Sequence, residues 1–209
     1  MKKLYIIMFA VLSLAGFAAA EVGIGLKAGG GEDDNNLKEA FIVNPNNYSS
    51  DENSGVAGVE VLWQQGGLFN LDAQHVIGAK AGFDIHGEAK FKDFTTDQQI
   101  KTNIFKIPVT AYYKYAPQEM PFNFWAGAGA TMAKIKWEYN DYGTGDSASL
   151  SNTLVYPHIK AGAEWRPNKL FGLGLDVGYN FGGEFKAAGA FKRDISGFEG
   201  FLAARFYFL

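Results

Sequence analysis

The side chains with the greatest capacity for chemistry are three histidines, in a chain that contains no cysteine: His75, His86 and His158. His86 stands between two acids in the pattern Asp84-x-His86-x-Glu88. On a strand these three groups share one face, but successive members lie about 6.5–7 Å apart. Groups spaced in this way rarely converge on one ion, and Lys80 and Lys90 bracket the three. The spacing therefore favours ion pairing over a metal site.

Other common site chemistries find less support. The acidic stretch at residues 31–36 lacks the spaced oxygens and the closing glutamate of an EF-hand, so it is interpreted as a solvated loop. The net charge of −3 gives no sign of the basic surface that nucleic-acid binding requires. Without cysteine the chain has neither a disulfide framework nor an acylated cysteine anchor.

The first 20 residues have the organisation of a secretory signal peptide. Lys2 and Lys3 precede an apolar run, and small residues up to Ala20 come directly before Glu21. A membrane-anchoring helix is the alternative, for which the apolar run is short. We expect cleavage to leave one domain, residues 21–209, because no linker, fixed repeat or further long apolar run divides it.

The rest of the chain alternates between apolar and polar or small residues with a period of two, which predicts strands with two different faces. In residues 170–183 six apolar side chains fall on one face, and four glycines, Asp176 and Asn180 fall on the other. Similar alternation marks residues 22–29, 56–64, 76–91, 105–115, 122–132, 154–166 and 197–209. Segment 76–91 is long enough to project beyond a bilayer. The pattern therefore predicts eight strands.

Two features interrupt the alternation. After Ala133 the apolar residues become odd-numbered, which predicts either a bulge near Met132–Lys134 or an exit from the membrane at that point. Pro108 and Pro157 each remove a ladder donor inside a predicted strand, and local bulges would accommodate them.

The connections decide which face points outward. Long polar connections at about 30–55, 92–99, 140–152 and 183–197 alternate with short links at 116–120 and 167–170 and a longer link near 65–75. Glycine fills the polar face, where it would weaken a wet strand but would make room inside a narrow barrel. Aromatic residues gather at the segment ends, as at a lipid interface. These features favour an antiparallel up-and-down transmembrane barrel with its apolar face outward.

This orientation defines two sets of residues. The predicted aromatic girdle consists of Trp63, Tyr113, Tyr115, Phe122, Phe124, Trp165, Phe171, Phe206 and Phe208. The predicted polar network of the lumen consists of Lys27, Glu60, Lys80, Asp84, His86, Glu88, Lys106, Lys114, His158, Lys160, Glu164, Arg166, Asp176, Glu199 and Arg205. Its bases and acids nearly balance, so we expect interlocked ion pairs that fill the interior.

The signal peptide, the eight alternating segments and the aromatic final strand together resemble the small eight-stranded outer-membrane β-barrel proteins of Gram-negative bacteria. That superfamily includes the OmpA transmembrane domain, OmpX and OmpW. The resemblance covers the whole mature chain and implies an integral outer-membrane protein with extracellular loops and periplasmic termini. It also implies outer-membrane lipid and lipopolysaccharide as surroundings, and a barrel-assembly machinery that recognises the final strand. Here the outward aromatic of that strand is Phe208, and Leu209 follows it.

Members of the resembled superfamily differ in activity, so function has to be argued from the residues. Some relatives modify lipid A with histidine and serine, but no serine lies two positions from His86 or His158 on a lipid-facing row. We therefore expect a non-enzymatic surface barrel, without a cofactor or a metal, that has a structural or surface-interaction role in adhesion or envelope integrity. Its four surface loops would contact a host or envelope protein. The alternatives are a narrow channel for small or hydrophobic solutes and, as a different class, a secreted lipocalin-like binder.

Overall fold

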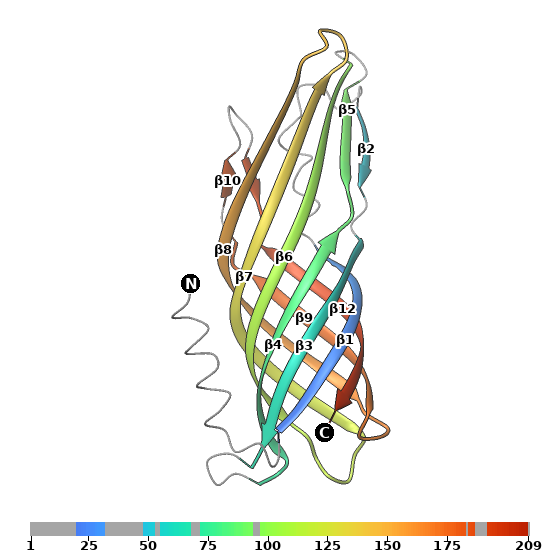
Figure 1. Cartoon of the computed structure of the whole chain (residues 1–209), viewed down its shortest axis with the longest axis vertical. Coiled ribbons are helices and arrows are strands. Elements are labelled where there is room, and N and C mark those ends of the chain that lie inside the picture. Colours follow the sequence, from blue (N-terminus) through green and yellow to red (C-terminus); the bar gives the residue numbers. More distant parts are fainter. Residues whose placement is uncertain are drawn as a thin grey trace.

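A computed structural model of the chain describes residues 20–31, 48–52, 55–67, 72–93, 97–182, 184–186 and 192–208. The predicted signal peptide lies outside the described residues except for Ala20. Eight long strands form the barrel: β1 (Ala20–Gly31), β3 (Gly55–Gly66), β4 (His75–His86), β6 (Gln98–Tyr115), β7 (Phe122–Asp141), β8 (Ser147–Trp165), β9 (Phe171–Asn180) and β12 (Gly197–Phe208). Each pairs with its neighbours in antiparallel fashion, in the order β1-β3-β4-β6-β7-β8-β9-β12 (Figure 1).

The barrel is closed by its first and last strands. β12 pairs with β1 from Val22↔Phe208 to Gly31↔Glu199. The other edge of β12 pairs with β9, and the ring is completed by pairing of β6 with β7. The eight-stranded antiparallel barrel and its closure by the C-terminal segment are therefore confirmed.

Four short strands accompany the barrel: β2 (Tyr48–Glu52), β5 (Ala89–Asp93), β10 (Glu184–Lys186) and β11 (Lys192–Asp194). β6, β7 and β8 continue past the end of the barrel, where β5 pairs with β6 and β2 pairs with β5. Figure 1 shows this extension as a tall sheet above the barrel, which we call the projecting sheet. Segment 76–91 therefore does extend beyond the barrel, but as two strands, β4 and β5.

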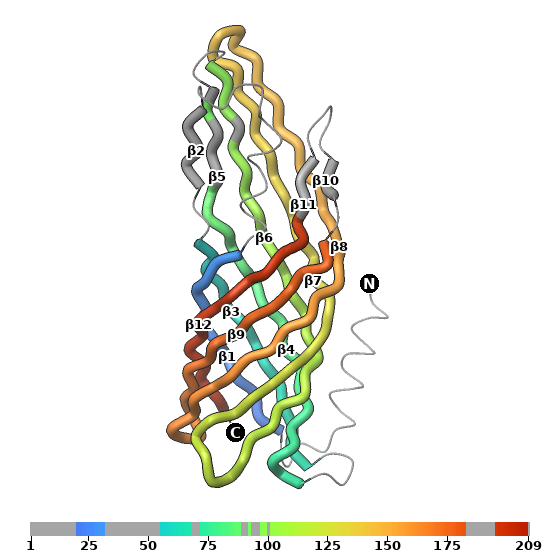
Figure 2. The backbone as a smooth tube through the Cα atoms, turned by 180° about the vertical axis from the view of Figure 1, so that it is seen from behind, coloured from blue at the N-terminus to red at the C-terminus, as the bar shows by residue number. Residues whose placement is uncertain are grey.

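Two of the predicted long loops were wrong. Strands cover 92–93 and 98–99 of the first segment and 140–141 and 147–152 of the second, so that only 94–97 and 142–146 separate the paired strands. The cause is tertiary: their polar residues pair with neighbouring strands, as in Glu138↔Ser149, and strand pairing outweighs a polar composition. The short links and the C-terminus lie together at the opposite end of the barrel (Figures 1 and 2).

The predicted bulges were also wrong. The register of β7 with β6 and with β8 is unbroken from one end to the other, so no residue is inserted at Met132, Pro108 or Pro157. Pro108 instead faces a gap in the β4–β6 ladder, which resumes in the same register at Asp84↔Lys106. Pro157 lies just beyond the end of the β8–β9 ladder, and its carbonyl accepts a hydrogen bond of 2.9 Å from the Phe181 amide. Each proline thus lies where the neighbouring strand does not require a backbone N–H donor.

The two faces of the wall have opposite character. Leu26, Val61 and Leu175 point outward and are 54–56% exposed, whereas Lys106, Glu164 and Arg205 are 1–2% exposed inside. On β7 the inward row remains odd-numbered throughout, and the outward row changes from Met132 to Lys134. The outward row of β7 is apolar from Phe122 to Met132, and we call this band around the barrel the apolar belt. The change in pattern after Ala133 is therefore the point where β7 leaves the apolar belt. Among the described residues no helix is long and apolar enough to cross a membrane.

Candidate functional site

The interior of the barrel holds a dense network of charged side chains. All residues of the predicted lumen network are buried, except Glu88 and Arg166, which are partly exposed. Glu88 lies in the short link between β4 and β5, and Arg166 directly follows β8. Because a buried charge is costly unless it is paired, the partners of each group determine what this interior can do.

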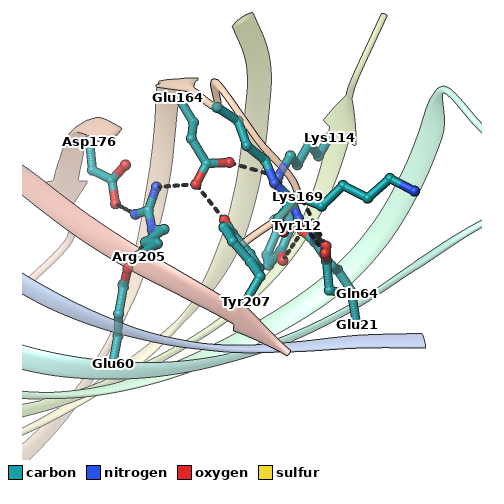
Figure 3. Close-up of polar contacts among 11 residues, drawn as sticks. Glu21, Glu60, Gln64, Tyr112, Lys114, Glu164, Lys169, Asp176, Arg205 and Tyr207 are labelled. Carbon is teal, nitrogen blue, oxygen red and sulfur yellow. Dashed lines mark hydrogen bonds and ion pairs between the residues drawn. The ribbon is translucent and has the colours of Figure 1, made fainter. Parts of the chain in front are cut away.

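Arg205 on β12 occupies the middle of the network. Its Nε donates to Glu60 Oε1 at 2.6 Å, and its Nη2 donates to Asp176. Lys80 approaches the same Asp176 carboxylate at 3.0 Å and lies 3.4 Å from the centroid of the Trp125 ring. Figure 3 shows the guanidinium between Asp176 and Glu60. One cation from the closing strand thus joins strands on both sides of it.

A second cluster fills the end near the short links. Lys114 Nζ donates to Glu164 Oε2 at 2.8 Å and to Gln64 Oε1 at 3.2 Å. The Tyr207 hydroxyl donates to Glu164, and the Tyr112 hydroxyl donates to Gln64 at 3.1 Å. Figure 3 shows Glu164 between the side chains of Arg205, Lys114 and Tyr207, so this cluster is continuous with the central one.

Glu21 closes the interior at this end. Its carboxylate accepts from Arg166 Nη1 at 2.9 Å and from the Gln64 amide. The Arg166 guanidinium also lies 4.0 Å from the centroid of the Tyr207 ring. The first residue of the predicted mature chain is therefore part of the network.

The half of the network near the projecting sheet is built on two carboxylates. Asp84 pairs with Lys27 at 2.7 Å. Glu199 pairs with Lys160 and, at 3.8 Å, with Lys106. Asn180 Nδ2 donates to the same Glu199 carboxylate at 2.9 Å. Each of these ion pairs joins two different strands, so together they connect separate parts of the barrel wall across the lumen.

The three histidines do not come together. His158 is fully buried between two threonine hydroxyls, with Nε2 2.9 Å from Thr110 Oγ1 and Nδ1 2.8 Å from Thr131 Oγ1. His86 is buried at the far end of β4, and His75 lies at the other end, where its ring stacks on Tyr113. The described residues contain no group of three potential ligands that could hold a metal ion.

Glycine provides the space for the long charged side chains. A Cβ at Gly172 would lie 2.6 Å from Glu164 Oε1, and one at Gly178 would lie 2.9 Å from Lys160 Cγ. The glycine-rich inward face of β9 thus leaves room for the charged side chains of β8. Two gaps in this interior, one lined by Lys27, Glu60, Asp176 and others and one lined by Leu62, Tyr112, Trp125 and others, each have a volume of about 10 Å³, the space of about one water molecule.

An apolar cluster closes the lumen toward the projecting sheet. Its members come from three strands, β6, β7 and β8, and from the link between β11 and β12, and all are at most 6% exposed: Ile104, Ala133, Ile135, Trp137, Tyr156 and Ile195. Ile135 and Trp137 continue the same inward row that carries Thr131 in the barrel. The described interior is therefore charged in the barrel and apolar above it.

The residues of the predicted aromatic girdle all lie on the outward face. Seven are 40–54% exposed, and Trp63 and Phe171 are partly buried. Phe171 packs against Phe206 on the neighbouring strand β12, with ring centroids 5.4 Å apart. Phe208 also points outward and is 54% exposed.

Sequence reasoning missed several residues of the interior. Gln64, Tyr112, Thr110, Thr131, Asn180 and Tyr207 satisfy the charges and the histidine but are themselves uncharged. A usable signal was present, because each lies on the inward parity of its strand. Restricting the network to lysine, arginine, carboxylates and histidine left them out.

The comparisons with known proteins agree with this architecture. No family model and no curated protein sequence matches the chain. Among solved structures, the Ail attachment invasion locus protein of Yersinia pestis aligns with 90% of this chain and 97% of its own, at 17% identity and a TM-score of 0.50. OprG of Pseudomonas aeruginosa aligns with 91% of this chain and 96% of its own, at 11% identity and a TM-score of 0.52.

A major outer membrane protein of Thermus thermophilus aligns with 91% of this chain and 100% of its own, at 12% identity and a TM-score of 0.56. At these identities the likeness concerns the fold alone. The chain has the fold of the small eight-stranded outer-membrane β-barrels.

Proposed function

We propose that the protein is an integral outer-membrane barrel that acts as an anchor and presents its projecting sheet at the cell surface for structural or adhesive contacts. The observation that carries this proposal is the opposite character of the two faces of the wall. A secreted barrel of the lipocalin type would bury its apolar face. Here the apolar face is outside, and the charges are buried and paired.

The height of the apolar belt supports this assignment. On β7 the outward row is apolar from Phe122 to Met132. These residues span about 33 Å of strand at about 3.3 Å per residue. A strand tilt of about 40° reduces that length to about 25 Å along the barrel axis, the height of the apolar band of outer-membrane barrels.

The orientation follows from the connections. Barrels of this kind have short periplasmic turns and longer extracellular loops, so the projecting sheet is assigned to the cell surface and both termini to the periplasm. Residues 1–20 would direct export and be removed. β12, with Phe208 outward, would be the strand that the assembly machinery recognises.

The interior supports an anchor rather than a channel or an enzyme. Paired side chains fill the lumen from Glu21 to Glu199, and the apolar cluster covers them. An eight-stranded barrel is just wide enough for such filling. His158, held between two threonines, is not placed to attack a lipid from outside.

Cell fractionation tests the location. The mature chain should sediment with outer membranes and migrate differently on gels before and after boiling. Recovery of the chain in the soluble periplasm, without a heat-dependent gel shift, would refute the membrane assignment.

Planar-bilayer recording tests the closed lumen. We expect no steady conductance from the wild type. Lys106→Glu places a second acid beside Glu199 and should open transient conductance steps if the network is the plug. Steady wild-type steps that Lys106→Glu abolishes would establish a channel instead.

A further inference from the structure

The outward face of the projecting sheet carries lysines just beyond the apolar belt. Three adjacent rungs cross β6, β7 and β8, and residues paired across strands share a face. The first rung is Phe105–Lys134–Thr153, the second is Asn103–Lys136–Ser151, and the third is Lys101–Glu138–Ser149. Lys134 and Lys136 are exposed, and Lys101 is half-buried.

The charges on these rungs are ordered by their distance from the belt. The two rungs nearest the belt hold cations only, and the first acid, Glu138, appears in the third. Glu138 pairs with Lys136 at 2.7 Å. Lys134 and Lys101 have no ion-pair partner among the described residues. The surface directly beyond the belt is therefore cationic over its first two rungs.

The heights of the rungs place these ammonium groups at the level of lipid headgroups. Two residues of a strand tilted by about 40° rise about 5 Å along the barrel axis. Lys134 therefore lies about 5 Å beyond Met132, and Lys136 about 10 Å beyond it. The headgroup layer on each side of a bilayer is about 5–8 Å thick. A lysine stem can also bend toward the interface by a few ångströms.

We propose that Lys134 and Lys136, supported by Lys101, bind the phosphate groups of the anionic glycolipid in the outer leaflet. The hydroxyls of Thr153 and Ser151 and the amide of Asn103 flank the two lysines on the same rungs and offer additional donors. The site rests on the proposed function, since it requires the belt to be in a membrane. It specifies the partner of that surface as a phosphorylated lipid.

Native mass spectrometry of the folded full chain in neutral detergent tests the site. The probes are bis-phosphorylated lipid A, dephosphorylated lipid A and inorganic phosphate. We expect retention of the phosphorylated lipid only. A lysine near an anionic surface changes affinity by about five-fold, so Lys134→Gln/Lys136→Gln should weaken retention by about 25-fold. The matched control is Lys169→Gln, which removes an exposed lysine in the short link between β8 and β9, away from the projecting sheet.

Three outcomes would overturn the proposal. They are unchanged retention by the double variant, equal retention of dephosphorylated lipid A, and displacement of the lipid by an equal concentration of inorganic phosphate. Lys134→Arg/Lys136→Arg should retain the lipid, which separates loss of charge from loss of folding. The heat-dependent gel shift of each variant reports on the barrel itself, so failure of the lipid site leaves the proposed function standing.

Discussion

Two lysine–glutamate pairs of nearly equal length allow the effect of burial on ion pairing to be measured in one molecule. Lys114 lies 2.8 Å from Glu164, with both side chains at most 3% exposed. Lys136 lies 2.7 Å from Glu138, with side chains 49% and 37% exposed. Replacement of either lysine by methionine removes the same charge and keeps a similar apolar stem.

Lys114→Met should lower the free energy of unfolding by about 3 kcal/mol. Removal of one partner from a buried pair costs about 3–5 kcal/mol because the other charge stays buried. The lower end applies here, since Arg205 Nη1 lies 3.9 Å from Glu164 and the Tyr207 hydroxyl still donates to it. Lys136→Met should cost less than about 1 kcal/mol, as expected for exposed pairs.

The assay is urea unfolding of the barrel in phospholipid vesicles, followed by tryptophan fluorescence and by the heat-dependent gel shift. The variant Lys114→Met/Glu164→Gln removes the stranded charge and should recover more than half of the loss. Equal losses for Lys114→Met and Lys136→Met, or no recovery in the double variant, would refute the reasoning that burial governs the strength of these pairs.

Three further predictions concern packing and pH. Gly172→Ala should cost about 1–3 kcal/mol in the same assay because its methyl group displaces the Glu164 carboxylate, whereas Gly200→Ala, whose nearest atom would be 3.9 Å away, should be neutral. Ile135→Ala should cost about 2–5 kcal/mol because it empties part of the apolar cluster, and the exposed Tyr142→Ala less than about 1 kcal/mol. In the β7–β8 turn, beyond the belt, hydrogen bonds from the Thr144 and Gly143 amides lower the pKa of Asp141 from its ordinary 3.8. The stability that this carboxylate gives the turn is therefore present above pH 3.8 and lost as the pH falls through the lowered pKa. Protection of the two amides, measured as deuterium exchange relative to the intrinsic rate at each pH, should fall there in the wild type but not in Asp141→Asn.

The barrel was predictable because a wall with two different environments leaves a period of two in every strand that crosses it. In residues 170–183 the alternation identified β9, its outward leucines and its inward glycines together. The same reasoning failed above the belt because both faces change character there. Lys134 replaces an apolar residue outside, and Ile135 replaces a polar or small residue inside. In the sequence, the continuous strand β7 therefore looks like one in which the apolar residues move from even to odd positions.

The odd or even position of a residue in its strand indicated that it faces the lumen, but it did not indicate which charged residues form ion pairs with each other. Lys80 and Lys90 bracket Asp84 in sequence, yet Asp84 pairs with Lys27 on β1, and Lys80 reaches across the lumen to Asp176. Which charges meet depends on strand register and on side-chain length across the barrel. Neither is encoded within one strand, since Arg205 and Glu60 are 145 residues apart.

The closing strand has a consequence for the order of assembly. Pairing of β1 with β12 joins the two ends of the described chain, so this seam has a very high contact order and is expected to form late. Arg205 arrives with that last strand, and until then Glu60 lacks its hydrogen-bonded cation and Asp176 has only Lys80. An open barrel would therefore expose a carboxylate that only closure neutralises, which penalises insertion of half-formed intermediates into lipid. In the proposed outer-membrane barrel, pairing of β12 with β1 would therefore bring in the cation that makes burial of these carboxylates in lipid less costly.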